Sequence, residues 1–218
     1  MEPIFQQDFQ VQELCVDRYG RLKPSTLLYF AQEIAGRHCD ELADTLKSHR
    51  LFWAVTRHRV QVTRMPTRGE TIRVETWPLP ATRAAFPRSV VAYDAQGDEV
   101  FRCMTLWVLM DVNTRHLITP GKSGIILAGT HRGGELPAPA GLIPRPLGTQ
   151  RTRTVNFSDL DRNGHMNNTR CMDWIADLLP SQFHQNHTVS DFTVCYLAEA
   201  RAGQELRLNW DIAPDGAL

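Results

Sequence analysis

The chain has 218 residues, which allows one large domain or two small ones. Its 24 basic and 24 acidic residues cancel, so the total charge does not indicate a nucleic-acid partner. No apolar run approaches the roughly 18–20 residues of a membrane span, and the first residues lack the basic start and apolar core of a signal peptide. The five cysteines show no CxxC spacing, which predicts free thiols in a reducing cytoplasm.

The first elements in the chain are a strand and a helix. Residues 9–16 alternate weakly between apolar and polar side chains and are predicted to form a strand. Pro24 suits the first position of a helix, and apolar residues then recur at three- and four-residue spacing as far as His38. A second helical piece is expected over residues 40–48.

After residue 50 the apolar pattern changes to a period of two, which is typical of strands. A hairpin signal over residues 94–98 joins the last two of them. The strands are predicted over residues 51–65, 72–76, 89–93 and 100–110. This order predicts an α+β fold, with one long helix laid across a strongly curved antiparallel sheet.

Residues 119–148 differ from the rest of the chain. They contain seven of the 14 glycines and five of the 13 prolines, with few periodic apolar positions. The segment is therefore predicted to be a linker, which could wrap over a surface.

A repeat follows the linker. Residues 17–22, DRYGRL, align with residues 161–166, DRNGHM, at a shift of 161 − 17 = 144. The apolar helix positions coincide at the same shift, and Gly69 returns as Gly203 at a shift of 203 − 69 = 134. One unit used twice is the natural interpretation, with an N-terminal half over residues 1–118, the linker over 119–148 and a C-terminal half over 149–218.

The second copy of the repeat ends early. Three predicted strands follow Gly69, whereas only one, over residues 205–212, follows Gly203. We therefore expect the C-terminal half to lack its last strands and to have two fewer strands than the N-terminal half. Either the chain is a truncated form or its second sheet is small.

Side chains that could take part in catalysis are concentrated in the second copy of the repeat. The second copy has Asn163 and His165 where the first has Tyr19 and Arg21. Taken alone, Asp161 and its neighbours could form a polar turn that caps a helix. The same residues resemble the start of a calcium loop, but Arg170 occupies the position where a bidentate glutamate belongs, which makes a calcium-binding module a distant alternative.

Residues 158–168, SDLDRNGHMNN, together with Trp174, resemble the acyl-[acyl-carrier-protein] thioesterases, in the bacterial branch related to the plant plastid enzymes. Shorter matches, among them residues 75–77 and 107–111, follow in the same order, so that the resemblance covers nearly the whole chain. It implies a tandem hotdog fold, in which a long helix is wrapped by a curved antiparallel sheet in each half.

The resemblance also implies an activity and its residues. It implies a hydrolase that cleaves fatty acyl-[acyl-carrier-protein], releases free fatty acid and ends fatty acid synthesis, without a cofactor or a metal. The catalytic residues carried over by the motif match are Asp161, Asn163, His165 and Glu199. The plant pattern has a cysteine directly after the glutamate, where this chain has Ala200, so direct attack by water is expected.

Thioester hydrolysis needs a base for water and a donor for the oxyanion. Glu199 or Asp161 can supply the base, and the sequence leaves that choice open. Asn163 can hold the water or the carbonyl through its amide, and His165 can hydrogen-bond either of them or the acid. The start of the helix after Asn168 is expected to add free backbone N–H groups.

The first copy is expected to build the binding cavity. The aromatic residues on its predicted strands should pack in the core, and some should line an acyl tunnel: Trp53, Trp77, Trp107 and Phe101. Its arginines could form a partly basic face that attracts an acidic carrier protein, or equally be scattered solvated residues: Arg57, Arg59, Arg64, Arg83, Arg88 and Arg115. An acyl-CoA thioesterase and a non-catalytic acyl-thioester-binding module are the alternatives. The chain-length preference and a homodimer remain open.

Overall fold

The computed structural model describes residues 2–213. Its strands are β1 (Phe5–Gln10), β2 (Leu51–Val62), β3 (Thr71–Pro78), β4 (Phe86–Tyr93), β5 (Glu99–Asp111), β6 (Leu117–Ile118), β7 (Thr149–Thr154), β8 (Asp191–Cys195) and β9 (Glu205–Trp210). Its helices are η1 (Glu13–Cys15), α1 (Pro24–His38), η2 (Asp40–Leu42), α2 (Ala43–Ser48), α3 (Pro120–Ser123), η3 (Phe157–Asp159), α4 (Arg170–Ala176) and α5 (Ser181–Asn186). Within residues 2–213, none of these helices is long and apolar enough to cross a membrane.

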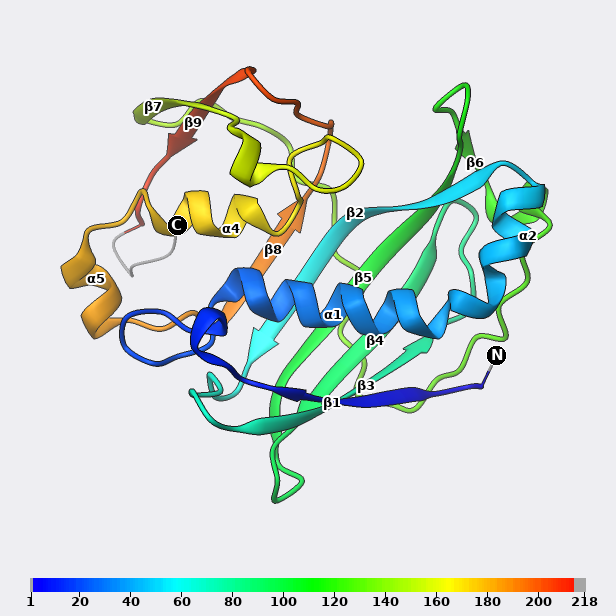
Figure 1. Ribbon diagram of the computed structural model, residues 1–218, viewed down its shortest axis with the longest axis horizontal. Coiled ribbons are helices and arrows are strands. Elements are labelled where there is room, and N and C mark those ends of the chain that lie inside the picture. Colours follow the sequence, from blue (N-terminus) through cyan, green and yellow to red (C-terminus); the bar gives the residue numbers. More distant parts are fainter. Residues whose placement is uncertain (1, 214–218) are drawn as a thin grey trace.

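A seven-stranded antiparallel sheet dominates the fold, with α1 lying across one of its faces (Figure 1). The strand order is β1-β3-β4-β5-β2-β8, and β6 pairs with the end of β5. Strand β8 comes from the second copy and pairs with β2 of the first, while β7 and β9 form a separate two-stranded sheet. The two halves therefore share the main sheet.

Helix α1 forms where its periodicity predicts it. Pro24 occupies the first turn, where its missing N–H is not needed, and the helix ends at His38. Its apolar side, which includes Leu27, Ala31 and Ile34, is fully buried against the sheet. These residues and the inward side chains of five strands make the main core, which burial from water stabilises.

The predicted first strand was wrong in its position. Strand β1 covers Phe5–Gln10, four residues earlier than the sequence indicates. The weakly alternating stretch that follows folds back on itself, because the Cys15 N–H donates to the Gln12 carbonyl (3.0 Å) in η1. Val16 then forms an isolated bridge with Leu22, so this stretch closes a loop and does not extend the sheet.

The repeat is visible element by element. Strand β7 lies 144 residues after β1, and η3 lies 144 residues after η1. The pair β7–β9 also keeps the register of β1–β3: Phe5 faces Thr76 in the first copy, and Thr149 faces Trp210 in the second. Residues 2–118 contain five long strands and the two-residue β6, whereas residues 149–213 contain three strands, a difference of two if β6 is left aside.

Residues 134–139, within the connecting segment over residues 119–148, lie on the sheet face opposite α1. The Trp77 indole on β3 donates to Glu135 (3.3 Å), and Arg102 on β5 donates to the Gly134 carbonyl. Farther along, Arg57 on β2 donates to the Pro139 carbonyl (3.3 Å). Since side chains alternate between the two faces of a strand, these residues point away from the core that α1 covers.

His58 on β2 is buried in the main sheet and should make stability depend on pH. Its side chain is 0% exposed, with Nδ1 3.8 Å from the Cys103 sulfur and Nε2 3.4 Å from the Gln32 amide nitrogen. Burial lowers the pKa of His58 from 6.5 to about 3. In the unfolded chain His58 therefore becomes protonated near pH 6.5, whereas in the folded chain it becomes protonated only near pH 3.

We expect the free energy of unfolding to fall by about 1.4 kcal/mol per pH unit as the pH drops below 6.5. Urea unfolding of the wild type and of His58→Leu between pH 4 and 8 measures this slope. The slope should become shallower in His58→Leu and stay unchanged in the control His116→Leu, which replaces an exposed histidine. Equal slopes in wild type and His58→Leu would contradict the assignment.

Candidate active site

The site is built on a tight turn over residues 161–165. The Asp161 carboxylate oxygen Oδ1 accepts the backbone N–H groups of Asn163 (2.8 Å) and His165 (3.2 Å), and Oδ2 accepts the Asn163 amide (3.3 Å). Gly164 has a φ of +75°, which suits glycine. The Asp161 N–H also donates to the His165 carbonyl (2.8 Å), so the turn is closed from both ends.

The first copy contains the same turn with other side chains. There the Asp17 carboxylate accepts the N–H groups of Tyr19 (2.8 Å) and Arg21 (3.1 Å), and Gly20 also has a φ of +75°. The aspartate thus holds the turn in both copies, including the first copy, which lacks the candidate catalytic side chains. For Asp161 this supports the polar-turn interpretation, and the difference between the copies lies at positions 163 and 165.

Glu199 lies beside this turn, 34 residues later in the chain. Its carboxylate oxygen Oε2 lies 3.3 Å from Nε2 of His165, with the histidine side chain 15% exposed and the glutamate side chain 45% exposed. Arg115 donates to the other oxygen, Oε1, and its guanidinium lies 4.5 Å from the ring centre of Phe52. The first half of the chain thus supplies a cation to the site, which the motif match did not assign.

Backbone contacts between distant segments bring Glu199 to the turn. The Met166 N–H donates to the carbonyl of Ala200 (2.8 Å), the residue directly after Glu199. His165 and Arg201 form an isolated antiparallel bridge, and the Gly203 N–H donates to the Val155 carbonyl (2.9 Å). Four of the predicted site residues, Asp161, Asn163, His165 and Glu199, therefore gather at one place.

A buried acid anchors the turn to α4. Asp159 is 2% exposed and accepts the Asn156 N–H (3.0 Å) and the Trp174 indole N–H (3.1 Å). Burial by itself would raise the pKa of Asp159, but these two hydrogen bonds and the nearby Arg170 lower it. Asp159 stays an anion that fixes the scaffold.

The start of α4 is less open than the sequence predicts. The N–H of Thr169 donates to the side chain of Asn167 (3.0 Å), and the N–H of Arg170 donates to the Asn167 carbonyl (2.9 Å). These two N–H groups are therefore not free donors, contrary to the expectation, because Asn167 accepts both hydrogen bonds.

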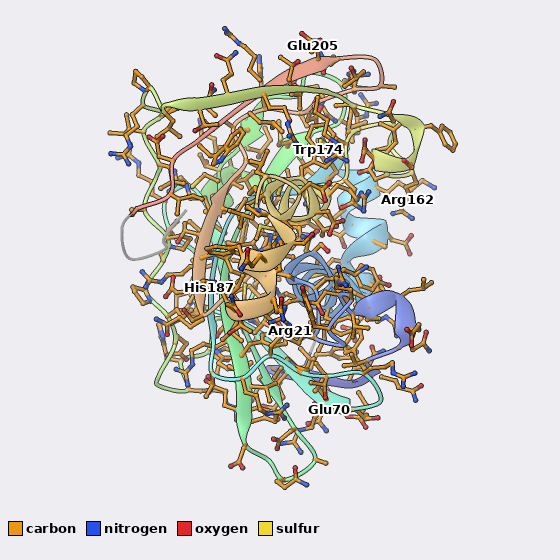
Figure 2. The ribbon with its side chains drawn as sticks, turned by 90° about the vertical axis from the view of Figure 1, so that its left-hand side faces the viewer. Arg21, Glu70, Arg162, Trp174, His187 and Glu205 are labelled. Carbon is orange, nitrogen blue, oxygen red and sulfur yellow. The ribbon has the colours of Figure 1, made fainter. Side chains whose placement is uncertain are left out.

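A cavity of ≈260 Å³ lies next to the turn in the first half of the chain. Arg162, between Asp161 and Asn163, lines it and lies on the side of the sheet that carries α1 and α2 (Figure 2). Trp53 and Trp107 line it too, as a tunnel would require, whereas Trp77 and Phe101 do not. The remaining lining comes from Ala35, Gly36, Cys39, Asp40, Ala43, Leu46, Pro78, Phe86, Pro87, Arg88 and Leu127.

Most arginines of the predicted basic face make contacts within the protein. Arg59 pairs with Asp191 (3.2 Å), and Arg88 is buried at 3% exposure, where it donates to the His38 ring (2.9 Å). Arg64 pairs with acids of its own half. The arginines are thus divided between ion pairs, the cavity and the site.

Comparison with known proteins assigns the chain to a family. Residues 2–120 match the model of the acyl-ACP thioesterase N-terminal domain, and residues 148–214 match that of the C-terminal domain. The chain belongs to the acyl-ACP thioesterase family. The two matched ranges correspond to the two copies of the repeat, and the fold is the hotdog fold, as the sequence predicts.

Individual relatives agree with this assignment. A crystal structure of an acyl-ACP thioesterase from Bacteroides thetaiotaomicron is 26% identical, with a TM-score of 0.83 over 98% of this chain and 88% of that one. A chloroplastic acyl-[acyl-carrier-protein] hydrolase from Cuphea viscosissima is 26% identical over 90% of this chain, and a chloroplastic dodecanoyl-[acyl-carrier-protein] hydrolase from Umbellularia californica is 31% identical over 72%. The chain spans about half the length of these two plant relatives, 52% and 44%.

Proposed function

We propose that this protein hydrolyses the thioester of fatty acyl-[acyl-carrier-protein] and releases free fatty acid. One observation carries the proposal: Glu199 and His165 meet at 3.3 Å beside the Asp161 turn, in a chain of the acyl-ACP thioesterase family. The adjoining cavity is lined by Trp53 and Trp107 and offers an apolar place for the acyl chain.

Glu199 is the acid that we assign as the base. The Asp161 carboxylate accepts three hydrogen bonds that hold its own turn closed. The Glu199 carboxylate is 45% exposed and holds no backbone turn, although His165 and Arg115 each contact one of its oxygens. In the proposed reaction the Glu199 carboxylate accepts a proton from water, and the water oxygen forms a bond to the thioester carbonyl carbon. The oxyanion of the tetrahedral intermediate accepts a hydrogen bond from the Asn163 amide. The carbon–sulfur bond then breaks, and the leaving sulfur takes up the proton that Glu199 received from water.

His165 and Asp161 act as positioning residues in this scheme. His165 contacts one oxygen of Glu199 and Arg115 contacts the other, so the carboxylate is held from both sides. Asp161 fixes the backbone that carries Asn163 and His165. No attacking cysteine is needed, in keeping with Ala200 directly after Glu199.

We expect Asp161→Ala to lower kcat at least tenfold, because the turn loses the acceptor of two backbone N–H groups. Asp161→Asn should retain most of the wild-type kcat, since the asparagine side-chain oxygen can still accept hydrogen bonds from both backbone N–H groups. Asp17→Ala removes the same support from the first-copy turn and should lose stability without losing kcat. Steady-state kinetics of the folded variants measures these changes in kcat. A loss in Asp161→Asn as deep as in Asp161→Ala would show that the charge itself is needed.

The test of the function is hydrolysis of a chain-length series of acyl carrier proteins, from octanoyl to stearoyl, measured by thiol release. Acyl-CoA thioesters of the same lengths form the second arm. We expect turnover with the carrier protein, at a kcat/KM above that for CoA. A preference for CoA would assign the acyl-CoA alternative. Binding without thiol release in either arm would leave the protein as a non-catalytic module.

A further inference from the structure

A second hollow lies on the outer side of the acyl cavity. It measures ≈670 Å³ and is formed between the turn over residues 81–83 and the start of the connecting segment over residues 119–127. Two of its lining residues, Phe86 and Leu127, also line the inner cavity of ≈260 Å³. Phe86 and Leu127 therefore lie between the two spaces.

Phe86 forms the rigid part of this boundary. It is the first residue of β4, is 3% exposed and faces Trp107 across the β4–β5 ladder. Its ring meets the Trp53 ring edge-on, with 5.0 Å between the ring centres. Phe86 thus contacts both tryptophans of the inner cavity and closes it on the outer side.

Leu127 is held by the backbone of the connecting segment. Two residues later, a Cβ atom at Gly129 would lie 2.2 Å from the Pro80 nitrogen, so the segment packs directly on the end of β3. The Thr130 N–H donates to the Pro78 carbonyl (2.8 Å) next to it. This close approach fixes Leu127 against the small hydrophobic cluster that contains Phe86.

We infer that Phe86 and Leu127 form a partition that limits the acyl chain, so that these two residues set the chain length this protein accepts. The inner cavity is smaller than the roughly 300–1,000 Å³ of most ligand sites, which favours acyl chains of short or medium length. The outer hollow has the room for further methylene groups, and the side chains of Phe86 and Leu127 border both spaces. The inference rests on the proposed function for the identity of the ligand.

The test measures binding without requiring hydrolysis. Non-hydrolysable S-alkyl pantetheine thioethers, from octyl to hexadecyl, are titrated calorimetrically into the wild type, Phe86→Ala and Leu127→Ala. In the wild type the affinity should stop rising at a medium length. In both variants it should keep rising, and the affinity ratio of hexadecyl to decyl should increase at least tenfold, since each buried methylene adds to binding.

Ile126→Ala is the matched control, because Ile126 is 91% exposed and lines only the outer hollow. It should keep the wild-type length profile. Thermal melts check that every variant is folded. If Phe86→Ala fails to fold, Phe86→Leu takes its place in the titration. An unchanged length profile in the Phe86 and Leu127 variants overturns the partition, as does a wild type that binds no thioether. Normal binding without any hydrolysis of acyl carrier proteins would instead contradict only the proposed function.

Discussion

Glu199→Gln should reduce kcat by about 10²–10⁴-fold, the range that a general base contributes. Glutamine keeps the shape of the side chain and can still accept a hydrogen bond from Arg115, but it cannot take a proton from water. Glu199 does not line the cavity, so KM should change little. Thiol release from an acyl carrier protein under saturating substrate measures both constants.

The matched control is Glu205→Gln, which removes the same charge from an exposed position on β9. It should leave kcat within a factor of two. If Glu199→Gln retains wild-type turnover while Asp161→Asn does not, the base has been assigned to the wrong acid. The two carboxylates are thereby distinguished by experiment, which the sequence alone does not achieve.

Asn163→Asp should reduce kcat by about 10²–10³-fold, the usual loss when one oxyanion donor is removed. The change is isosteric, but it replaces an amide N–H donor with a carboxylate next to Asp161. A second negative charge there also opposes the charge that develops on the thioester oxygen. Asn163→Ala, which removes the donor without adding charge, should lose activity less severely.

Binding of the thioether analogues provides the check on this interpretation. An oxyanion donor acts in the transition state, so the affinity of Asn163→Ala for an uncharged analogue should equal that of the wild type. Asn209→Ala, at an exposed position of β9, controls for the loss of a surface amide. Weakened binding in Asn163→Ala with an unchanged kcat would instead give Asn163 a role in substrate binding.

Local features of the sequence were sufficient for the turn and the long helix. An aspartate followed by a glycine three residues later closes the same turn in both copies, because its carboxylate reaches backbone N–H groups two and four residues ahead. The spacing of apolar residues after Pro24 likewise predicts α1, since one helix face must be buried. The first strand was misplaced because weak alternation over residues 9–16 does not reveal where backbone hydrogen bonds go.

The sequence by itself therefore determined the repeated unit and, through the motif, the family, and it predicted three candidate site residues within five positions, from Asp161 to His165. The tertiary structure shows Asp161 bound within its own turn and Glu199 brought to His165 and Arg115 by contacts between distant segments. It also decided the place of Arg115 and the packing of Leu127 against the cluster that contains Phe86. Both depend on how the connecting segment and strands pack in three dimensions, and the spacing of residues along a chain does not encode such packing in a readable form.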